Sequence, residues 1–128
     1  MKKISTFFLL LFFIASCSKD PAGEILQSSV TLYGTVMHHW WRVGNIKVYI
    51  KGNAIEYPGS DPAAYDSFIK ADPGGSFIFN SLPSGNYYLY AKGFDPTWGD
   101  TVNGALFLTL TVEPGHSIDV DTIVNVSE

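Results

Sequence analysis

Apolar and polar residues alternate over most of the chain beyond residue 29. The clearest case is segment 46–51, where Ile46, Val48 and Ile50 are separated by Lys47 and Tyr49. Successive side chains of a strand point to opposite faces, so this pattern predicts a strand with one buried face. Comparable runs predict six more strands, at residues 30–37, 65–71, 76–79, 86–94, 105–112 and 117–126.

Turn-forming residues separate the predicted strands, most clearly at 72–75 and 83–85. No window of about 11 residues after the N-terminal segment keeps a helical period. Only residues 61–64 predict one helical turn, with Pro62 in its first position. Seven short strands separated by turn-forming residues predict an all-β fold, a seven-stranded antiparallel β-sandwich over residues 29–128.

The same alternation predicts the hydrophobic core. Along segment 86–94, Tyr87, Leu89 and Ala91 share the inward face, whereas Tyr88 and Tyr90 point outward or toward a neighbouring strand. A buried Tyr87 hydroxyl needs a hydrogen-bond acceptor, most simply a backbone carbonyl. The side chains expected to be mostly buried are those of Val48, Ile50, Phe77, Phe79, Leu89, Leu108 and Leu110.

The N-terminal segment has a different pattern. Lys2 and Lys3 precede a mainly apolar run over residues 4–15. This run has the length of an export signal and is too short to cross a bilayer core of about 30 Å. Ser16 and Cys17, the only cysteine, come directly after it, and a polar spacer follows over residues 18–28.

The residues Ile14-Ala15-Ser16-Cys17 resemble the lipobox of bacterial lipoproteins. The resemblance implies a signal peptide over 1–16, a lipid on Cys17 and a flexible tether over 17–28. The stretch 18–24 is similar to the acidic segment that follows the lipidated cysteine in surface-exported lipoproteins of Bacteroidota. We therefore expect an outer-membrane lipoprotein of the bacterial cell envelope, exposed at the surface. The alternative is a plain secretory signal with an unmodified cysteine.

Composition narrows the classes of partner. The 128 residues include 8 basic and 12 acidic ones, and Lys2 and Lys3 would leave with the signal. Nucleic acid is not expected as a partner, because its phosphates require clustered Lys and Arg. Lipidation of the only cysteine would exclude disulfides, thiol catalysis and cysteine-bound zinc. The oligomeric state stays undetermined.

Two consecutive segments resemble the carboxypeptidase regulatory-like domain, a transthyretin-like Greek-key β-sandwich. They are Asp72-Pro73-Gly74-Gly75-Ser76-Phe77-Ile78-Phe79 and Leu82-Pro83-Ser84-Gly85-Asn86-Tyr87-Tyr88-Leu89-Tyr90-Ala91. The resemblance extends over roughly residues 30–126 and implies a non-catalytic binding or scaffolding module. The chain departs from the family after its first strand, where His38-His39-Trp40-Trp41-Arg42 replaces a short polar turn. Loops on a rigid sandwich commonly carry function, so this insertion is the candidate binding loop.

Aromatic residues give this loop its main functional hypothesis. Trp40, Trp41 and Trp98 offer flat apolar faces with polar edges, which suit a glycan or an envelope protein. Strand counting brings the 94–101 loop, with Trp98, toward the same end of the sandwich, edged by Arg42, Asp95 and Asp100. The simpler interpretation is that the tryptophans cap the open end of the core.

No metal or other cofactor is predicted. Adjacent histidines on a strand point to opposite faces, so His38 and His39 do not readily chelate one ion, and a third ligand would have to come from His116 or an aspartate. Asp119 and Asp121 lack the ligand spacing of a calcium loop. No catalytic motif is present, and we predict no enzyme. The alternative function is a small carbohydrate-handling or metal-dependent hydrolase that uses residues 38–42.

Lipidation gives a direct test. We expect a radiolabelled fatty acid to be incorporated into the wild-type protein and not into Cys17→Ser, which should also leave the membrane fraction or remain uncleaved. Equal incorporation into both proteins would contradict an anchor at Cys17.

Overall fold

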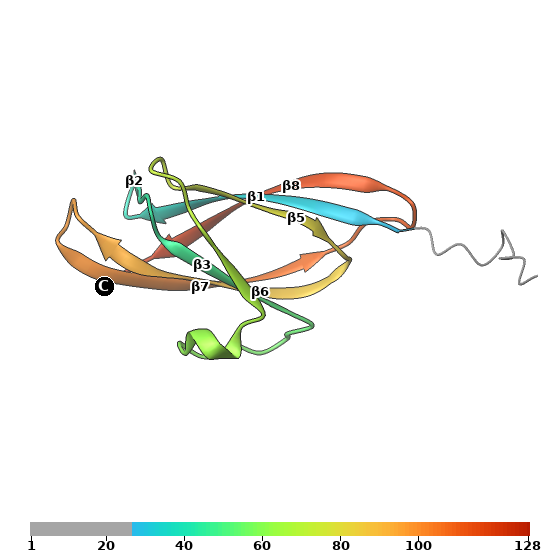
Figure 1. The fold of residues 1–128 in the computed structure, drawn as a ribbon, viewed down its shortest axis with the longest axis horizontal. Helices are drawn as coiled ribbons and strands as arrows, with labels where there is room; N and C mark the ends of the chain where they lie inside the picture. The colour runs from blue at the N-terminus through green and yellow to red at the C-terminus, as the bar shows by residue number, and fades with distance from the viewer. Residues whose placement is uncertain (1–26) are drawn as a thin grey trace, which may run out of the picture.

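The computed structural model describes residues 27–128 and forms two β-sheets packed face to face (Figure 1). The predicted signal peptide, Cys17 and nearly all of the tether lie outside the described residues. Within 27–128 no helix is long and apolar enough to cross a membrane. The all-β prediction is confirmed.

The first sheet is built around β1. This strand pairs with β8 in parallel over all ten of its residues, and its opposite edge pairs antiparallel with β5 and then with β2. These two short partners therefore follow one another along the same side of β1. The strand bounds are β1 Ser29–His38, β2 Trp41–Arg42, β5 Ser76–Leu82 and β8 Ser117–Val126.

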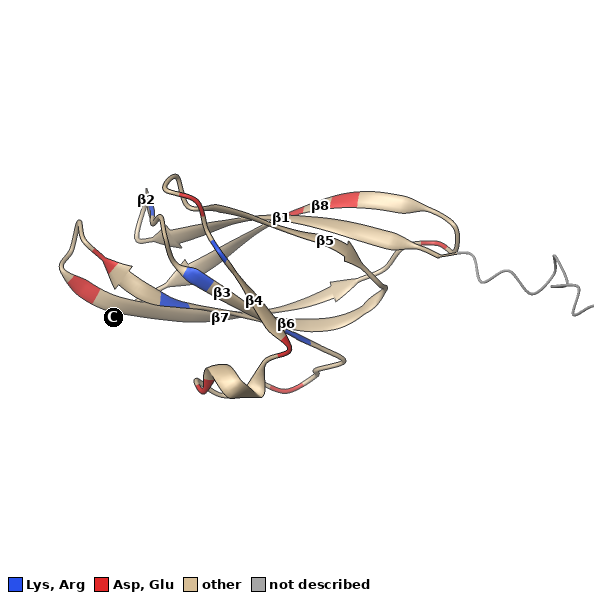
Figure 2. Cartoon of the chain, in the orientation of Figure 1, with Lys and Arg blue, Asp and Glu red and all other residues tan. Residues whose placement is uncertain are grey.

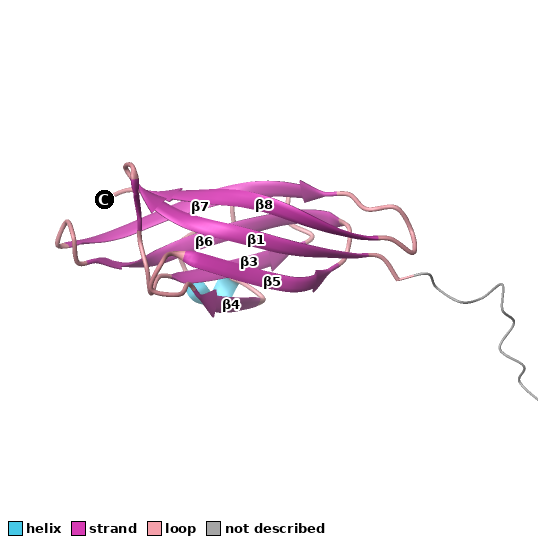
Figure 3. Ribbon diagram, turned by 90° about the horizontal axis from the view of Figure 1, so that it is seen from above, coloured by secondary structure: helices cyan, strands magenta, loops and turns pink. Residues whose placement is uncertain are grey.

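The second sheet is entirely antiparallel, in the order β4-β3-β6-β7. Its strands are β3 Lys47–Gly52, β4 Ser67–Lys70, β6 Gly85–Asp95 and β7 Asp100–Leu110. Figure 3 looks onto the first sheet, so that the strands of the second sheet lie beneath β1, β5 and β8. A bridge between Asn103 and Ser127 joins the two sheets where β7 approaches β8.

The prediction of seven antiparallel strands is wrong in two details. The eighth strand is β2, a two-residue element created by the hairpin turn at His39 and Trp40. The pairing of β1 with β8 is parallel. Alternation within a strand shows which face is buried, but it contains no information about the direction of a partner distant in sequence.

The predicted core is confirmed. Of its members, Leu108 is only partly buried but packs against the rest. Tyr87 is 6% exposed, and its hydroxyl donates to the carbonyl oxygen of Pro83 at 2.6 Å, as expected for a buried tyrosine. Gly34 allows the ring of Phe77 to lie over the backbone of β1, because a Cβ there would meet Phe77 Cζ at 1.9 Å.

The crossover between β3 and β4 covers part of the outer face of the second sheet (Figure 1). It contains the predicted helical turn as a 3-10 helix, Pro62–Ala64, capped by the side chain of Asp61. Tyr65 of this crossover stacks on Tyr90 with ring centroids 5.6 Å apart. Tyr90 faces outward as predicted, yet the crossover buries it, and burial raises the pKa of Tyr65 to about 12.

Charged residues are spread thinly over the sheets, as Figure 2 shows. One run of like charge consists of Lys70, Lys47 and Lys92, which are cross-strand neighbours on β4, β3 and β6. All three are exposed, and Lys47 Nζ lies 5.1 Å from the centre of the Phe68 ring. Like charges in register are unfavourable, so water and this ring contact must offset their repulsion.

The core gives a stability prediction. Phe79 is 8% exposed and packs edge-to-face on Phe77, so Phe79→Ala should lower the free energy of unfolding by about 3–5 kcal/mol. Ile78→Ala, on the outward face of the same strand and 40% exposed, should cost about 1 kcal/mol or less. Urea denaturation measures both, and equal midpoints for Phe79→Ala and wild type would contradict the register of β5.

Candidate functional site

The insertion at 38–42 forms the hairpin between β1 and β2. His38 pairs with Trp41, which leaves His39 and Trp40 as the two turn residues. His39 has a φ of 54°, a left-handed conformation that is uncommon for residues other than glycine and that Asn, Asp and His adopt more readily than most. This backbone reversal ends the alternation of β1. The expectation that the two histidines point apart is therefore wrong, and their rings lie 4.3 Å apart.

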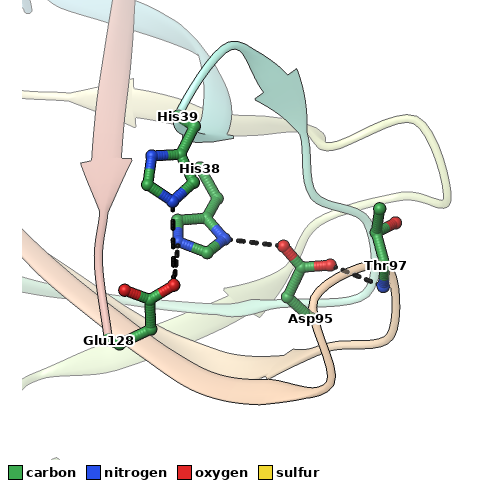
Figure 4. A network of polar contacts seen from close by, with 5 residues as sticks. All are labelled: His38, His39, Asp95, Thr97 and Glu128. Carbon is green, nitrogen blue, oxygen red and sulfur yellow. Dashed lines mark hydrogen bonds and ion pairs between the residues drawn. The ribbon is translucent and has the colours of Figure 1, made fainter.

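His38 is the buried anchor of the site. Its side chain is fully buried, and Nδ1 lies 2.8 Å from Oδ2 of Asp95, which is 2% exposed (Figure 4). The other carboxylate oxygen, Oδ1, accepts a hydrogen bond from the backbone N–H of Thr97. Burial raises the pKa of Asp95, but the hydrogen bonds from His38 and Thr97 outweigh it and hold the pKa below its usual value. An ionised Asp95 makes Nδ1 of His38 the donor.

The second nitrogen of His38 points toward Glu128, which follows β8. Glu128 Oε1 lies 3.3 Å from His38 Nε2 and 3.6 Å from His39 Nε2 (Figure 4). The contact with His38 lacks hydrogen-bond alignment, so Nε2 is buried without a hydrogen-bond partner. His38, His39 and Glu128 thus bring three potential metal-ligating atoms within 4.8 Å of one another.

Trp98 closes one side of this cluster. It lies on the turn between β6 and β7, and its ring centre is 4.8 Å from that of His39 and 5.8 Å from that of His38. Asp95 accepts two hydrogen bonds that shape this turn. Its side-chain Oδ1 accepts from the backbone N–H of Thr97, and its backbone carbonyl accepts from the N–H of Gly99. The structure therefore brings Trp98 to the 38–42 hairpin, as the sequence predicts.

Trp40 and Trp41 project into solvent. Trp40 is 89% exposed, Trp41 is 63% exposed and Trp98 is 49% exposed. The interpretation of Trp40 and Trp41 as caps on the core is wrong, because the core closes beneath them with His38 and Val126. Arg42 is also exposed.

Two other residues do not lie where the sequence predicts them. Asp95 does not edge the exposed aromatic surface, since its carboxylate turns inward to His38. His116 lies beside Ser29, at the other end of β1 from His38, and pairs with Glu113 at 3.6 Å. His116 is therefore not available as a third ligand to His38 and His39.

Outer surfaces of both sheets add features that sequence reasoning missed. A groove of about 620 Å³ crosses the first sheet, with Tyr33, Ile78 and Ile123 among its lining residues and Arg42 at its edge. On the second sheet a continuous series of aromatic rings in contact joins the crossover to the strands: Tyr49, Tyr57, Tyr65, Phe68, Tyr88, Tyr90 and Phe107. The dense aromatics of 86–94 were the only sequence signal for it.

Comparisons with known proteins give little beyond this geometry. No family model matches the chain, and no curated protein matches it. Among solved structures it is similar to a Pseudomonas aeruginosa protein described as a "putative carbohydrate binding protein", at 18% identity and a TM-score of 0.44. That likeness covers 81% of this chain and 92% of the other.

The buried pair gives the next prediction. Asp95→Ala leaves Nδ1 of His38 buried without an acceptor and should lower the free energy of unfolding by about 3 kcal/mol. Asp100→Ala, an exposed change on the same turn, should stay within about 0.5 kcal/mol of wild type. Chemical denaturation compares the two, and equal midpoints would mean that the His38–Asp95 contact contributes nothing to stability.

Proposed function

We propose that this protein is a non-catalytic binding module of the bacterial envelope, held in the outer membrane by a lipid on Cys17. Its ligand-binding surface is the end of the sandwich formed by the 38–42 hairpin and Trp98. The ligand class that this surface suits is a glycan or the glycan-bearing surface of an envelope partner.

The observation that carries the proposal is the exposure of the hairpin tryptophans. Trp40 and Trp41 are among the most water-exposed large apolar side chains of residues 27–128, and the core does not need either of them. Large exposed aromatic rings are costly to leave in water and are typical of binding surfaces. Their flat faces stack on sugar rings, and the indole N–H and Arg42 supply hydrogen-bond donors at the edge.

The direction of β1 supports the same proposal. The strand runs from Ser29, next to the tether, to His38, at the hairpin, and ten residues of strand span about 33 Å. The start of β1 and the hairpin lie at opposite ends of the molecule (Figure 1). A lipid attached before Ser29 would therefore leave the aromatic end directed away from the membrane surface.

We further propose that the module is of the carboxypeptidase regulatory-like, transthyretin-like Greek-key type. Two local features support this assignment within its most specific segments. Gly75 has a φ of 83°, and a Cβ there would lie 3.0 Å from the carbonyl oxygen of Val43. Pro83 supplies the carbonyl that accepts the Tyr87 hydroxyl bond. A glycine in the first segment and the Pro-x-Gly-x-Tyr order of the second thus each have a physical role in the fold.

Alanine substitution of the hairpin tryptophans tests the binding surface. Trp40→Ala and Trp41→Ala should each weaken binding to a glycan identified on an array by tenfold or more, because stacking provides the affinity. Their melting temperatures should stay within about 3 °C of wild type, since both rings are solvent-exposed.

Phe68→Ala is the matched control, because Phe68 is an aromatic residue of similar exposure on β4 of the other sheet. It should bind the same glycan as wild type does. Unchanged affinity in the Trp40→Ala/Trp41→Ala double variant would refute this surface, and so would a loss of affinity shared equally by Phe68→Ala.

A further inference from the structure

We infer that His38, His39 and Glu128 form a binding site for a divalent transition-metal ion, with Zn²⁺ the best match to the ligand set. The ligand atoms are Nε2 of His38, Nε2 of His39 and a carboxylate oxygen of Glu128. Asp95 orients His38 from behind. This inference does not depend on glycan binding at the neighbouring tryptophans.

Distances between the ligand atoms suit a tetrahedral ion. Zinc bonds to histidine nitrogen and carboxylate oxygen are about 2.0–2.2 Å long, so two ligands of one tetrahedral ion lie roughly 3.3–3.5 Å apart. Glu128 Oε1 lies 3.3 Å from His38 Nε2 and 3.6 Å from His39 Nε2. All three ligand atoms lie within 4.8 Å of one another, and the half-exposed side chains of His39 and Glu128 have room to move toward a common ion.

The unsatisfied nitrogen of His38 points to the same conclusion. Nδ1 of His38 lies 2.8 Å from Oδ2 of Asp95 and donates to it, so Nε2 is the nitrogen that can offer a lone pair to a metal ion. That atom is buried, has no hydrogen-bond partner and lies 3.3 Å from a carboxylate oxygen. A lone pair and a carboxylate repel each other unless a proton or a metal ion lies between them. A short contact without hydrogen-bond alignment is the arrangement of two ligands that both point at one ion.

Asp95 completes a carboxylate–histidine–metal arrangement. Histidine ligands in metal sites commonly donate their other ring N–H to a carboxylate, which fixes the tautomer and makes the ligand nitrogen more basic. Asp95 makes this contact with His38 at 2.8 Å, and Thr97 N–H holds the aspartate in turn. The tautomer needed for metal binding is therefore already fixed by buried residues.

The backbone of the hairpin also favours a shared ligand. His39 adopts a φ of 54° at a position where asparagine or glycine is more common. This conformation turns its ring to the side of His38 and Glu128, away from the opposite face that a regular strand would give it.

Donor chemistry selects the class of ion. Two imidazoles and one carboxylate are typical of zinc and also of non-haem Fe(II), and they do not match the all-oxygen ligand sets of calcium or magnesium. The side chains of His39 and Glu128 are 47% and 50% exposed, so a fourth position can be taken by water. A bound ion would connect the 38–42 hairpin to the segment after β8, two parts of the chain that are otherwise distant in sequence.

Zinc titration of the full-length protein tests the site. Isothermal titration calorimetry with ZnCl₂ should give one ion per chain, and zinc should raise the melting temperature relative to EDTA. His39→Ala and Glu128→Gln, both at exposed positions, should each weaken zinc binding by tenfold or more. X-ray absorption at the zinc edge should report two imidazole ligands with oxygen completing the shell.

His116→Ala is the matched control, because His116 also lies 3.6 Å from a glutamate but has no second histidine beside it. It should bind zinc as wild type does. The inference is overturned if wild type binds no zinc at one per chain, if Glu128→Gln or His39→Ala keeps wild-type affinity, or if His116→Ala loses it. Both ligand variants should keep the wild-type melting temperature in EDTA, which separates lost ligation from unfolding.

Discussion

The central position of β1 in its sheet is the constraint on which the rest of the structure depends. The strand is paired along its whole length with β8 and along its other edge with β5 and β2. Its inward side chains at Val30, Leu32, Val36 and His38 are fully buried. Because the last of these inward positions is a histidine, the apolar core ends in a polar group that must find partners inside the protein.

The partners of His38 determine the architecture of that end of the sandwich. Asp95 comes from the end of β6 and Glu128 from the segment after β8, so one imidazole connects both sheets. Asp95 also organises the β6–β7 turn, which holds Trp98 against the histidines. The exposed tryptophans of the hairpin therefore stand on a rigid base, and a surface of this kind loses little conformational entropy on binding a ligand.

The proposed glycan-binding surface and the proposed metal site are adjacent but make different physical demands. Stacking needs exposed rings, and these belong to Trp40 and Trp41. Ligation needs a fixed tautomer and converging donors, and these belong to His38 and its neighbours. The tryptophans and the histidines take different roles because His39 leaves the strand conformation. This change places the ring of His39 beside that of His38 and directs Trp40 into solvent.

The sequence by itself determined the fold class, six of the seven predicted strands to within a few residues at each end, and the buried side of the strands with the clearest alternation. Local alternation and turn residues contain that information, as at Val48, Phe79 and Leu89. It also singled out residues 38–42 and Trp98. Only the strand predicted at 105–112 differs appreciably from the observed one. β7 begins at Asp100, because pairing with β6 makes a strand of a stretch that looks like a turn in the sequence.

Tertiary structure alone decided how the site is assembled. The parallel partner of β1, the inward turn of Asp95 and the arrival of Glu128 at the histidines all depend on contacts between residues far apart in the chain. Periodicity within a strand describes its two faces but not its neighbours. The left-handed conformation of His39 could not be predicted from the sequence either. Nothing in a run of two histidines and two tryptophans indicates which residue will leave the strand and reverse the chain.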